Sequence, residues 1–233
     1  MIGSLIVIEG TDCSGKETQS KLLVEKLRKD GYKVGLMSFP EYNSATGKII
    51  GACLLGKPEM CRNLLKEEHG FFKEGGGDID EIVACYLYAA DRRYNLPSLL
   101  NLLNNNDIVI VDRYVTSNMA HRGGLKDSKE ERLRLYRMLE TLEYGFSELP
   151  RPDETYFLYM PYDYACKLKK NRIEELDEAE KNEDYLKRGE QAYLELADIY
   201  QFNTIHCIQN DNVRTIEDIN RELYSKVKKR ILK

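Results

Sequence analysis

The strongest chemical signal in the sequence is a short glycine-rich segment that ends in a lysine. It consists of Gly10, Thr11, Asp12, Cys13, Ser14, Gly15 and Lys16. The G-x-x-x-x-G-K spacing lets backbone N–H groups wrap round a phosphate, while the lysine neutralises its outer oxygens. An apolar run precedes the segment and a helical pattern follows it, which is the context that such a loop requires. We therefore predict a phosphate-binding loop over residues 10–16.

Two carboxylates could serve a metal ion beside this loop. Glu17 follows the lysine, where Ser or Thr normally places a hydroxyl on Mg²⁺, and Thr18 is turned about 100° further round the helix. Asp112 ends a second apolar run and could bind Mg²⁺ or a substrate hydroxyl. Either Glu17 contacts Mg²⁺ through water, or it faces away and other groups hold the ion. In both cases we expect Mg²⁺ to support the reaction.

Strands and helices must bring these groups together. Residues 5–8 and 108–111 are unbroken apolar runs, typical of strands buried on both faces. Weaker strand patterns cover residues 33–39, 155–160 and 204–208. Apolar residues recur at helical spacing in residues 16–29, 79–95, 129–144, 184–200 and 215–230. This alternation predicts one α/β domain over residues 1–233, with a mostly parallel sheet.

Composition argues against several other classes of protein. The 233 residues include 16 Gly and 6 Pro, too few for collagen or low-complexity disorder. A net charge of −4 disfavours electrostatic binding of nucleic acid by the whole protein. The six cysteines lack C-x-x-C spacing, which disfavours a zinc site or a disulfide framework. Reduced thiols are typical of the cytoplasm, so we expect a cytoplasmic protein. No apolar run approaches the roughly 18 residues of a membrane span, so we expect no membrane partners.

Several segments, taken in chain order, carry a resemblance to a known family. They are residues 9–19, 39–42, 88–92, 112–118 and 191–197. With these motifs the chain resembles the thymidylate kinases from residue 5 to about residue 220. The resemblance implies a P-loop NTPase-type sheet of about five strands flanked by helices, with a short lid. It also implies transfer of the γ-phosphoryl group of ATP to dTMP, and a homodimer.

The resemblance further implies roles for individual residues. Catalysis would involve Lys16, Asp112, Arg113 and an arginine of the lid. ATP would be bound by residues 10–18, with Arg214 either stacked on the adenine or merely exposed. The substrate-binding residues would be Asp12, Phe39, Tyr42, Tyr88, Arg92, Arg113, Ser117, Asn118 and His121.

Some of these residue types suit the chemistry independently of the resemblance. Tyr88 and Arg92 are four residues apart, so one helix face would present a ring for a base beside a guanidinium for a phosphate. Taken alone, the pair also fits a core tyrosine and a solvated arginine. By resemblance, Tyr88 replaces a stacking phenylalanine and Asn118 hydrogen-bonds the thymine edge. His121 falls where relatives often carry a tyrosine near the sugar, and its role stays open.

The lid is expected over residues 169–183. Family members carry a catalytic arginine either in the phosphate loop or in the lid, and Cys13 occupies the loop position here. Arg172 is therefore the best candidate, with Lys169 and Lys170 behind it. Two alternatives to a dTMP kinase stay open: a kinase of another nucleotide on the same scaffold, and a non-catalytic nucleotide-binding protein.

Overall fold

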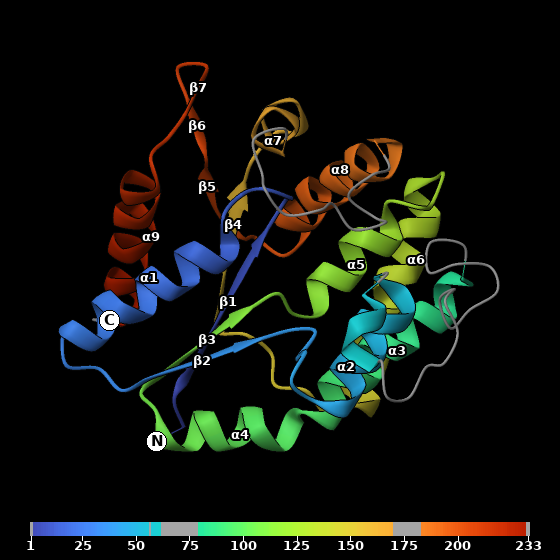
Figure 1. The fold of residues 1–233 in the computed structure, drawn as a ribbon, viewed down its shortest axis with the longest axis horizontal. Helices are drawn as coiled ribbons and strands as arrows, with labels where there is room; N and C mark the ends of the chain where they lie inside the picture. Colours follow the sequence, from blue (N-terminus) through green and yellow to red (C-terminus); the bar gives the residue numbers. More distant parts are fainter. Residues whose placement is uncertain (1, 56, 62–78, 170–182, 232–233) are drawn as a thin grey trace.

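The computed structural model describes residues 2–55, 57–61, 79–169 and 183–231. A sheet of five strands has the order β2-β3-β1-β4-β5, and every neighbouring pair is parallel (Figure 1). The strands are β1 Ser4–Gly10, β2 Val34–Ser38, β3 Ile108–Asp112, β4 Glu154–Tyr159 and β5 Asn203–His206. This confirms the predicted α/β class and its parallel sheet.

Helices separate the strands along the chain. They are α1 Lys16–Lys29, α2 Ala45–Leu54, α3 Glu81–Tyr94, α4 Leu96–Asn105, α5 Val115–Gly123, α6 Lys129–Glu140, α7 Tyr162–Lys169, α8 Glu183–Ile199 and α9 Ile216–Ile231. A π-helical turn, Thr141–Phe146, continues α6. A small hairpin of β6 Ile208–Gln209 and β7 Asn212–Val213 follows β5.

Side chains of the central strands alternate between two hydrophobic cores. On β1, Leu5 and Val7 belong to one core, whereas Ile6 and Ile8 belong to the other. The first core includes residues of α4, α5, α6 and α8, and the second includes residues of α1 and α9. Because successive side chains of a strand point to opposite faces, helices must cover both sides of the sheet. Figure 1 shows α1 and α9 on one side and α5, α6 and α8 on the other.

The strand register places chemically active residues at one edge of the sheet. Asp112 is level with Ile8 on one neighbour and with Ser38 on the other. The residues that follow these strand ends, which include the phosphate loop and Arg113, therefore share the carboxyl edge. The opposite edge holds the start of β1 and the end of α9, where Ser4 and Ile231 line the same cavity.

Element boundaries differ from the predictions in a few places. The predicted strand 204–208 is wrong at its end, because β5 stops at His206 and Ile208 pairs in the separate hairpin. The predicted helix 79–95 ends at Tyr94, and Pro97 lies in the first turn of α4, where its missing N–H costs nothing. Helices α2, α4, α5 and α7 were not predicted. In the part of the chain described here, no helix is long and apolar enough to cross a membrane.

Candidate active site

The phosphate loop, residues 10–16, joins β1 directly to α1. Gly10 is packed so closely that an added Cβ would lie 2.4 Å from the Ser14 Oγ and 2.8 Å from the Leu158 carbonyl oxygen. Gly15 has a φ of +77°, a left-handed conformation that glycine adopts without strain. The glycines of the motif are thus required by the loop's own geometry, which turns the chain into the N-terminus of α1.

Lys16 is buried within this loop. Its Nζ donates to the carbonyl oxygens of Gly10, at 3.0 Å, and Thr11, at 2.9 Å. Burial, together with the nearby Arg113 guanidinium, lowers the pKa of Lys16 to about 8. Its ammonium therefore lies at the start of α1, among the backbone groups expected to face a phosphate.

Asp112 and Arg113 connect the loop with the start of α5. Burial raises the pKa of Asp112, and its Oδ1 has no hydrogen-bond partner among the described residues. Arg113 has a φ of 65°, which is uncommon outside glycine. Its Nη2 lies 3.8 Å from the Asp12 Oδ1, and its Nη1 lies 3.4 Å from the His121 Nε2. The guanidinium therefore lies between the phosphate loop and α5.

Glu17 lies at the rim of the site. Its side chain is 76% exposed, and its Oε1 is 2.5 Å from the Nζ of Lys21, one turn along α1. Thr18 is also exposed. Both residues line the cleft beside the phosphate loop, but among the described residues that line it only Asp112 has a buried carboxylate oxygen without a hydrogen-bond partner.

A buried carboxylate that the sequence analysis did not single out organises this edge. Glu9 is fully buried at the end of β1. It accepts hydrogen bonds from Tyr114 N, Thr116 Oγ1, Ser117 N, Ser117 Oγ and Tyr193 OH, at 3.0, 2.7, 3.1, 2.6 and 3.3 Å. Glu9 therefore caps the N-terminus of α5, where orphan backbone N–H groups need an acceptor. A charged residue directly after a buried apolar strand was the available signal.

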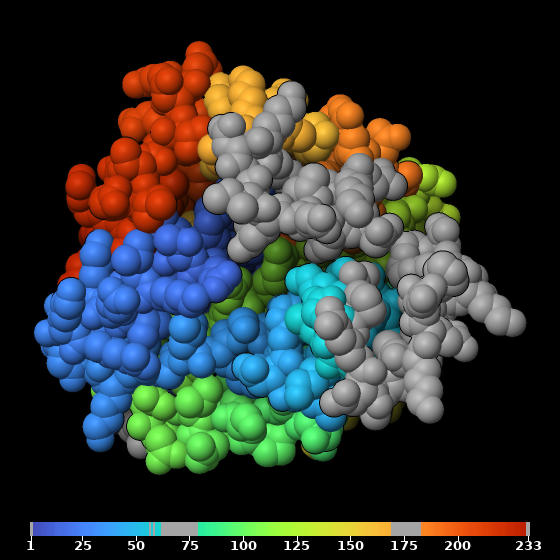
Figure 2. All heavy atoms as spheres, viewed as in Figure 1, coloured from blue at the N-terminus to red at the C-terminus, as the bar shows by residue number. Residues whose placement is uncertain are grey.

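Two hollows open on the carboxyl edge of the sheet. The loop cleft, lined by residues 12–13, 15–18 and 36–43 among others, encloses about 1390 Å³ including open solvent. The aromatic cavity encloses about 750 Å³, also including open solvent, and is lined by Tyr88, Tyr114 and Tyr185 among others. Both hollows are lined by Asp12, Phe39, Pro40, Tyr42 and Arg113. Figure 2 shows the surface hollowed between the blue N-terminal elements and cyan α2.

All nine residues predicted to bind the substrate line the aromatic cavity. They come from the phosphate loop, the segment after β2, α3 and the stretch from β3 into α5. The structure thus brings together side chains that are as far apart in sequence as Asp12 and His121. Pro40, Leu55, Tyr114, Arg122 and Tyr185 also line the cavity and were not predicted.

Arg92 is held by an ion pair within the protein. Its Nε donates to the Glu143 Oε2 at 2.9 Å, its Nη2 contacts the Glu143 Oε1, and its Nη1 lies 3.5 Å from the Tyr114 carbonyl oxygen. Glu143 is fully buried and comes from the π-helical turn. Arg92 was predicted to bind a phosphate. It lines the cavity, but most of its N–H donors already bond to Glu143 and Tyr114.

The neighbouring Asp91 fixes the segment after β2. It accepts from Glu41 N at 3.0 Å and from the Thr46 Oγ1 at 2.6 Å. The Asn95 Nδ2 also donates to it, at 3.0 Å. Asp91 thereby ties α3 to the segment that supplies Phe39 and Tyr42 to both hollows.

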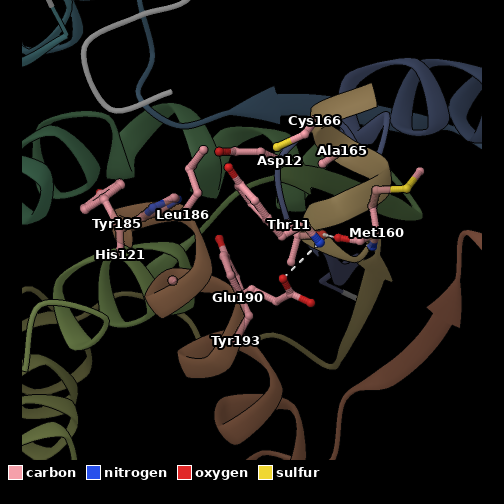
Figure 3. A pocket seen from close by; sticks show the side chains of 12 residues that line it. Thr11, Asp12, His121, Met160, Ala165, Cys166, Tyr185, Leu186, Glu190 and Tyr193 are labelled. Carbon is pink, nitrogen blue, oxygen red and sulfur yellow. Dashed lines mark hydrogen bonds between the residues drawn. The ribbon is translucent and has the colours of Figure 1, made fainter. Parts of the chain in front are cut away.

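His121 lines both the aromatic cavity and a lateral cavity whose walls include residues of α7 and α8. Figure 3 shows the lateral cavity. Its ring stacks on Tyr185, with centroids 5.9 Å apart, and meets Tyr193 edge-on at 5.7 Å. Burial, reinforced by the Arg113 charge, lowers the pKa of His121 to about 3. The neutral ring can therefore accept a hydrogen bond from Arg113 through Nε2.

Comparison with known proteins identifies one family. A family model described as thymidylate kinase matches residues 8–221. The chain belongs to the thymidylate kinase family.

Individual relatives agree with this assignment. A probable thymidylate kinase of Methanocaldococcus jannaschii is 29% identical over 225 residues, covering 96% of this chain and 95% of the relative. A thymidylate kinase of Desulfotalea psychrophila is 30% identical over 214 residues, covering 91% of each. A solved thymidylate kinase structure from Candida albicans shares the fold, with a TM-score of 0.71 at 24% identity over 98% of this chain and 92% of that chain.

Arg214, assigned by resemblance to the thymidylate kinases, lines neither hollow. Arg214 follows the β6–β7 hairpin, and its Nε and Nη1 are 2.7 Å from Asp218 and 2.6 Å from Glu222. Its donors are thus largely engaged, which leaves the planar face of the guanidinium for any stacking role. The lid candidates Lys170 and Arg172 lie outside the described residues, and Lys169 is the last residue of α7.

Proposed function

We propose that this protein transfers the γ-phosphoryl group of ATP to dTMP, giving dTDP and ADP. The main support for this proposal is that the loop cleft and the aromatic cavity meet at Asp12 and Arg113, which line both. A donor phosphate on the loop and an acceptor phosphate in the cavity would therefore face each other across one guanidinium. Phosphoryl transfer depends on this positioning and on charge neutralisation more than on covalent catalysis.

On the donor side, the backbone N–H groups of the phosphate loop would bind the ATP phosphates. The helix N-terminus and the Lys16 ammonium would neutralise part of their charge. The loop is anchored to the residue that follows β4, because the Thr11 hydroxyl donates to the Met160 carbonyl oxygen at 2.7 Å and accepts from its N–H at 2.9 Å. The loop therefore has a fixed relation to the sheet.

On the acceptor side, Arg113 would bridge the two reacting phosphates, a bidentate task for which guanidinium is well suited. Phe39, Tyr42 and Tyr88 would enclose the nucleotide, with a tyrosine ring stacked on the base. Asp12 would lie by the sugar hydroxyl. Ser117, whose Oγ donates to Glu9 at 2.6 Å, would stiffen the cavity wall.

The orientation of the Asn118 amide favours binding of thymine over binding of cytosine. Its Nδ2 donates to the Cys85 carbonyl oxygen at 3.3 Å, and a carbonyl can only accept, so this contact fixes the amide orientation. The Asn118 Oδ1 is left buried without a partner among the described residues. An acceptor at this place suits the N3–H donor of thymine, whereas N3 of cytosine is itself an acceptor.

The residues present fit Mg²⁺, which would be bound with ATP. The described residues include no group of three or more His, Cys, Asp and Glu that could hold a metal. Mg²⁺ commonly uses one or two carboxylates together with substrate phosphates and waters. Asp112, with its unpaired buried Oδ1, would supply that carboxylate, and Glu17 on the rim would act through water. The bound ion would neutralise charge on the transferred phosphoryl group.

A coupled ADP-release assay with ATP and Mg²⁺ tests this function across dTMP, dUMP, dGMP and thymidine. We expect turnover to be fastest with dTMP and to be lost in EDTA. A faster reaction with another acceptor would indicate a different nucleotide kinase on the same scaffold. If ATP raises the melting temperature but no acceptor yields ADP, the protein is a nucleotide-binding protein without this activity.

We propose further that the chain is a single domain that forms a cytoplasmic homodimer. One sheet uses strands from Ser4 to His206, which supports a single domain. Helix α3 leaves Val83 and Tyr86 exposed, and such apolar side chains suit an interface between copies. Light scattering after size-exclusion chromatography would give twice the monomer mass for the dimer.

A further inference from the structure

A short segment between β4 and α7 supports the phosphate loop. We call its residues, Tyr159, Met160, Pro161 and Tyr162, the anchor segment. Met160 is 2% exposed and makes two hydrogen bonds to the Thr11 hydroxyl, through its carbonyl oxygen at 2.7 Å and its N–H at 2.9 Å. Movement of the anchor segment would therefore also move Thr11.

Thr11 links the anchor segment with the lysine of the phosphate loop. Its carbonyl oxygen accepts a hydrogen bond from the Lys16 Nζ at 2.9 Å. Its N–H donates to the Leu158 carbonyl oxygen at 3.3 Å, and the residue is only 6% exposed. The position of the Lys16 ammonium thus depends on where the anchor segment holds Thr11.

Glu190 of α8 holds the anchor segment at both ends. Its Oε1 accepts from the Tyr159 hydroxyl at 2.7 Å, and its Oε2 accepts from the Tyr162 N–H at 3.0 Å. Burial, together with the bond to Glu190, raises the pKa of Tyr159, so its hydroxyl stays a donor at neutral pH. The Tyr162 N–H is the first of α7 and needs an acceptor from outside the helix. Figure 3 shows Glu190 on the wall of the lateral cavity together with Thr11 and Met160.

We propose that Glu190 is a positioning residue for phosphoryl transfer, acting through the anchor segment and Thr11 on the Lys16 ammonium. This inference rests on the proposed function, because it concerns the donor side of that reaction. Glu190 lines the lateral cavity, whereas the residues predicted to bind the substrate line the aromatic cavity. Loss of its carboxylate should therefore impair transfer and ATP binding and leave dTMP binding intact.

Glu190→Leu removes both bonds to the anchor segment and keeps a side chain of similar size. We expect kcat at saturating ATP and dTMP to fall about 10- to 100-fold, the upper value being the cost of displacing a group by about 1 Å. The dissociation constant of ATP, measured by calorimetry without an acceptor, should rise about 2- to 10-fold, the effect of one ordinary hydrogen bond. The KM for dTMP should change less than about twofold.

Glu190→Gln and Tyr159→Phe test the hydrogen bonds themselves. The Gln amide can accept from the Tyr162 N–H and donate to the Tyr159 hydroxyl, which is able to accept. We therefore expect Glu190→Gln to keep kcat within about threefold of the wild-type value. Tyr159→Phe removes one bond with little change in packing and should lower kcat about 3- to 10-fold. Added to Glu190→Leu, it should lower kcat less than about twofold further, because the shared contact is already lost.

Glu195→Leu is the matched control on the same helix. The Glu195 side chain is 15% exposed and pairs at 2.9 Å with Arg132 of α6, not with the anchor segment. We expect the control to lower the melting temperature, as Glu190→Leu does. Its kcat and its dissociation constant for ATP should stay within about twofold of the wild-type values.

Several results would overturn the inference. Wild-type kcat and ATP affinity in folded Glu190→Leu would show that the loop does not need this carboxylate. An unchanged kcat in Tyr159→Phe would contradict the inference even if Glu190→Leu did not fold. An equal loss of kcat in Glu195→Leu would make the effect a general consequence of lost stability.

Failure of the proposed function looks different from failure of this inference. The wild-type chain would then produce no ADP with any nucleoside monophosphate. Calorimetry with ATP would still test Glu190 in that case, because the anchor segment supports the phosphate loop whether or not an acceptor reacts.

Discussion

At the scale of single residues, three buried carboxylates hold the segments that carry the site. Glu9 fixes the start of α5, Asp91 fixes the segment after β2, and Glu143 fixes Arg92. Each accepts more than one hydrogen bond, and both of those to Glu143 come from Arg92, which offsets the cost of burying the charge. The residues proposed to act on the substrates are thereby positioned by contacts within the protein, as a reaction that depends on orientation requires.

The pKa of His121 gives a prediction about stability. The unfolded chain binds a proton at this residue near pH 6.5, whereas the folded chain does so only near pH 3. Folded-state stability should therefore fall as the pH drops below 6.5, by up to about 1.4 kcal/mol per pH unit. His121→Gln keeps a polar side chain and removes this loss.

Urea denaturation at pH 7.5 and pH 5.0 measures the effect. We expect the wild-type chain to lose about 2 kcal/mol more than His121→Gln between these values. Equal losses in the two proteins would mean that His121 titrates normally in the folded state.

Motif residues could be predicted from the sequence, but the groups that hold them could not. The phosphate loop and the Asp112–Arg113 pair follow apolar runs, so local context identified them. Glu143 and Glu190 lie in segments without a motif and matter only through contacts formed by the fold. The roles assigned by resemblance stay predictions until substrates are bound.

At the scale of elements, the π-helical turn after α6 is the feature that most directly serves the cavity. It carries Glu143 into the interior, opposite Arg92 on α3. π-helical turns are rare in proteins, and those that occur are often found at functional sites, where they change the direction of a side chain. Here the redirected side chain determines which nitrogens of Arg92 are available.

Glu143→Leu tests this element. The substitution leaves the Arg92 charge buried without its partner, and we expect the free energy of unfolding to fall by about 3–5 kcal/mol. Glu148→Leu is the matched control, because that carboxylate is 72% exposed and pairs with exposed Arg93. The control should cost less than about 1 kcal/mol in chemical denaturation. Similar losses in both variants would show that the buried pair is unimportant.

Most strands were predictable because buried parallel strands have unbroken apolar runs. Helices α2 and α5 were not predicted, and each has a structural reason. Eight of the nine residues of α5 are buried, so it lacks the polar face on which helical periodicity depends. Helix α2 begins after the Ser44 cap, but it contains two glycines, which lower helix propensity. Most of its residues are apolar, so the helical spacing of apolar and polar residues is hard to recognise in the sequence.

At the scale of the whole molecule, one predicted catalytic group, Arg172, lies outside the described residues. The resemblance implies a catalytic arginine either in the phosphate loop or in the lid, and Cys13 occupies the loop position. We therefore predict that Arg172 stabilises the transferred charge. Arg172→Ala should therefore lower kcat about 100- to 1,000-fold, the usual cost of removing one such group.

Steady-state assays with saturating ATP and dTMP measure this effect, and Lys170→Ala serves as the comparison. A large loss of kcat in Lys170→Ala, with an unchanged kcat in Arg172→Ala, would assign the role to the lysine. An unchanged kcat in both variants would contradict the prediction that the lid supplies this group.

The start of β1 and the end of α9 share the sheet edge that faces away from both hollows. A purification tag or a fused fluorescent protein attached at either position would project from the rear of the molecule. The protein could accordingly be anchored to a sensor chip through either end, with nucleotides still free to diffuse into the opposite side.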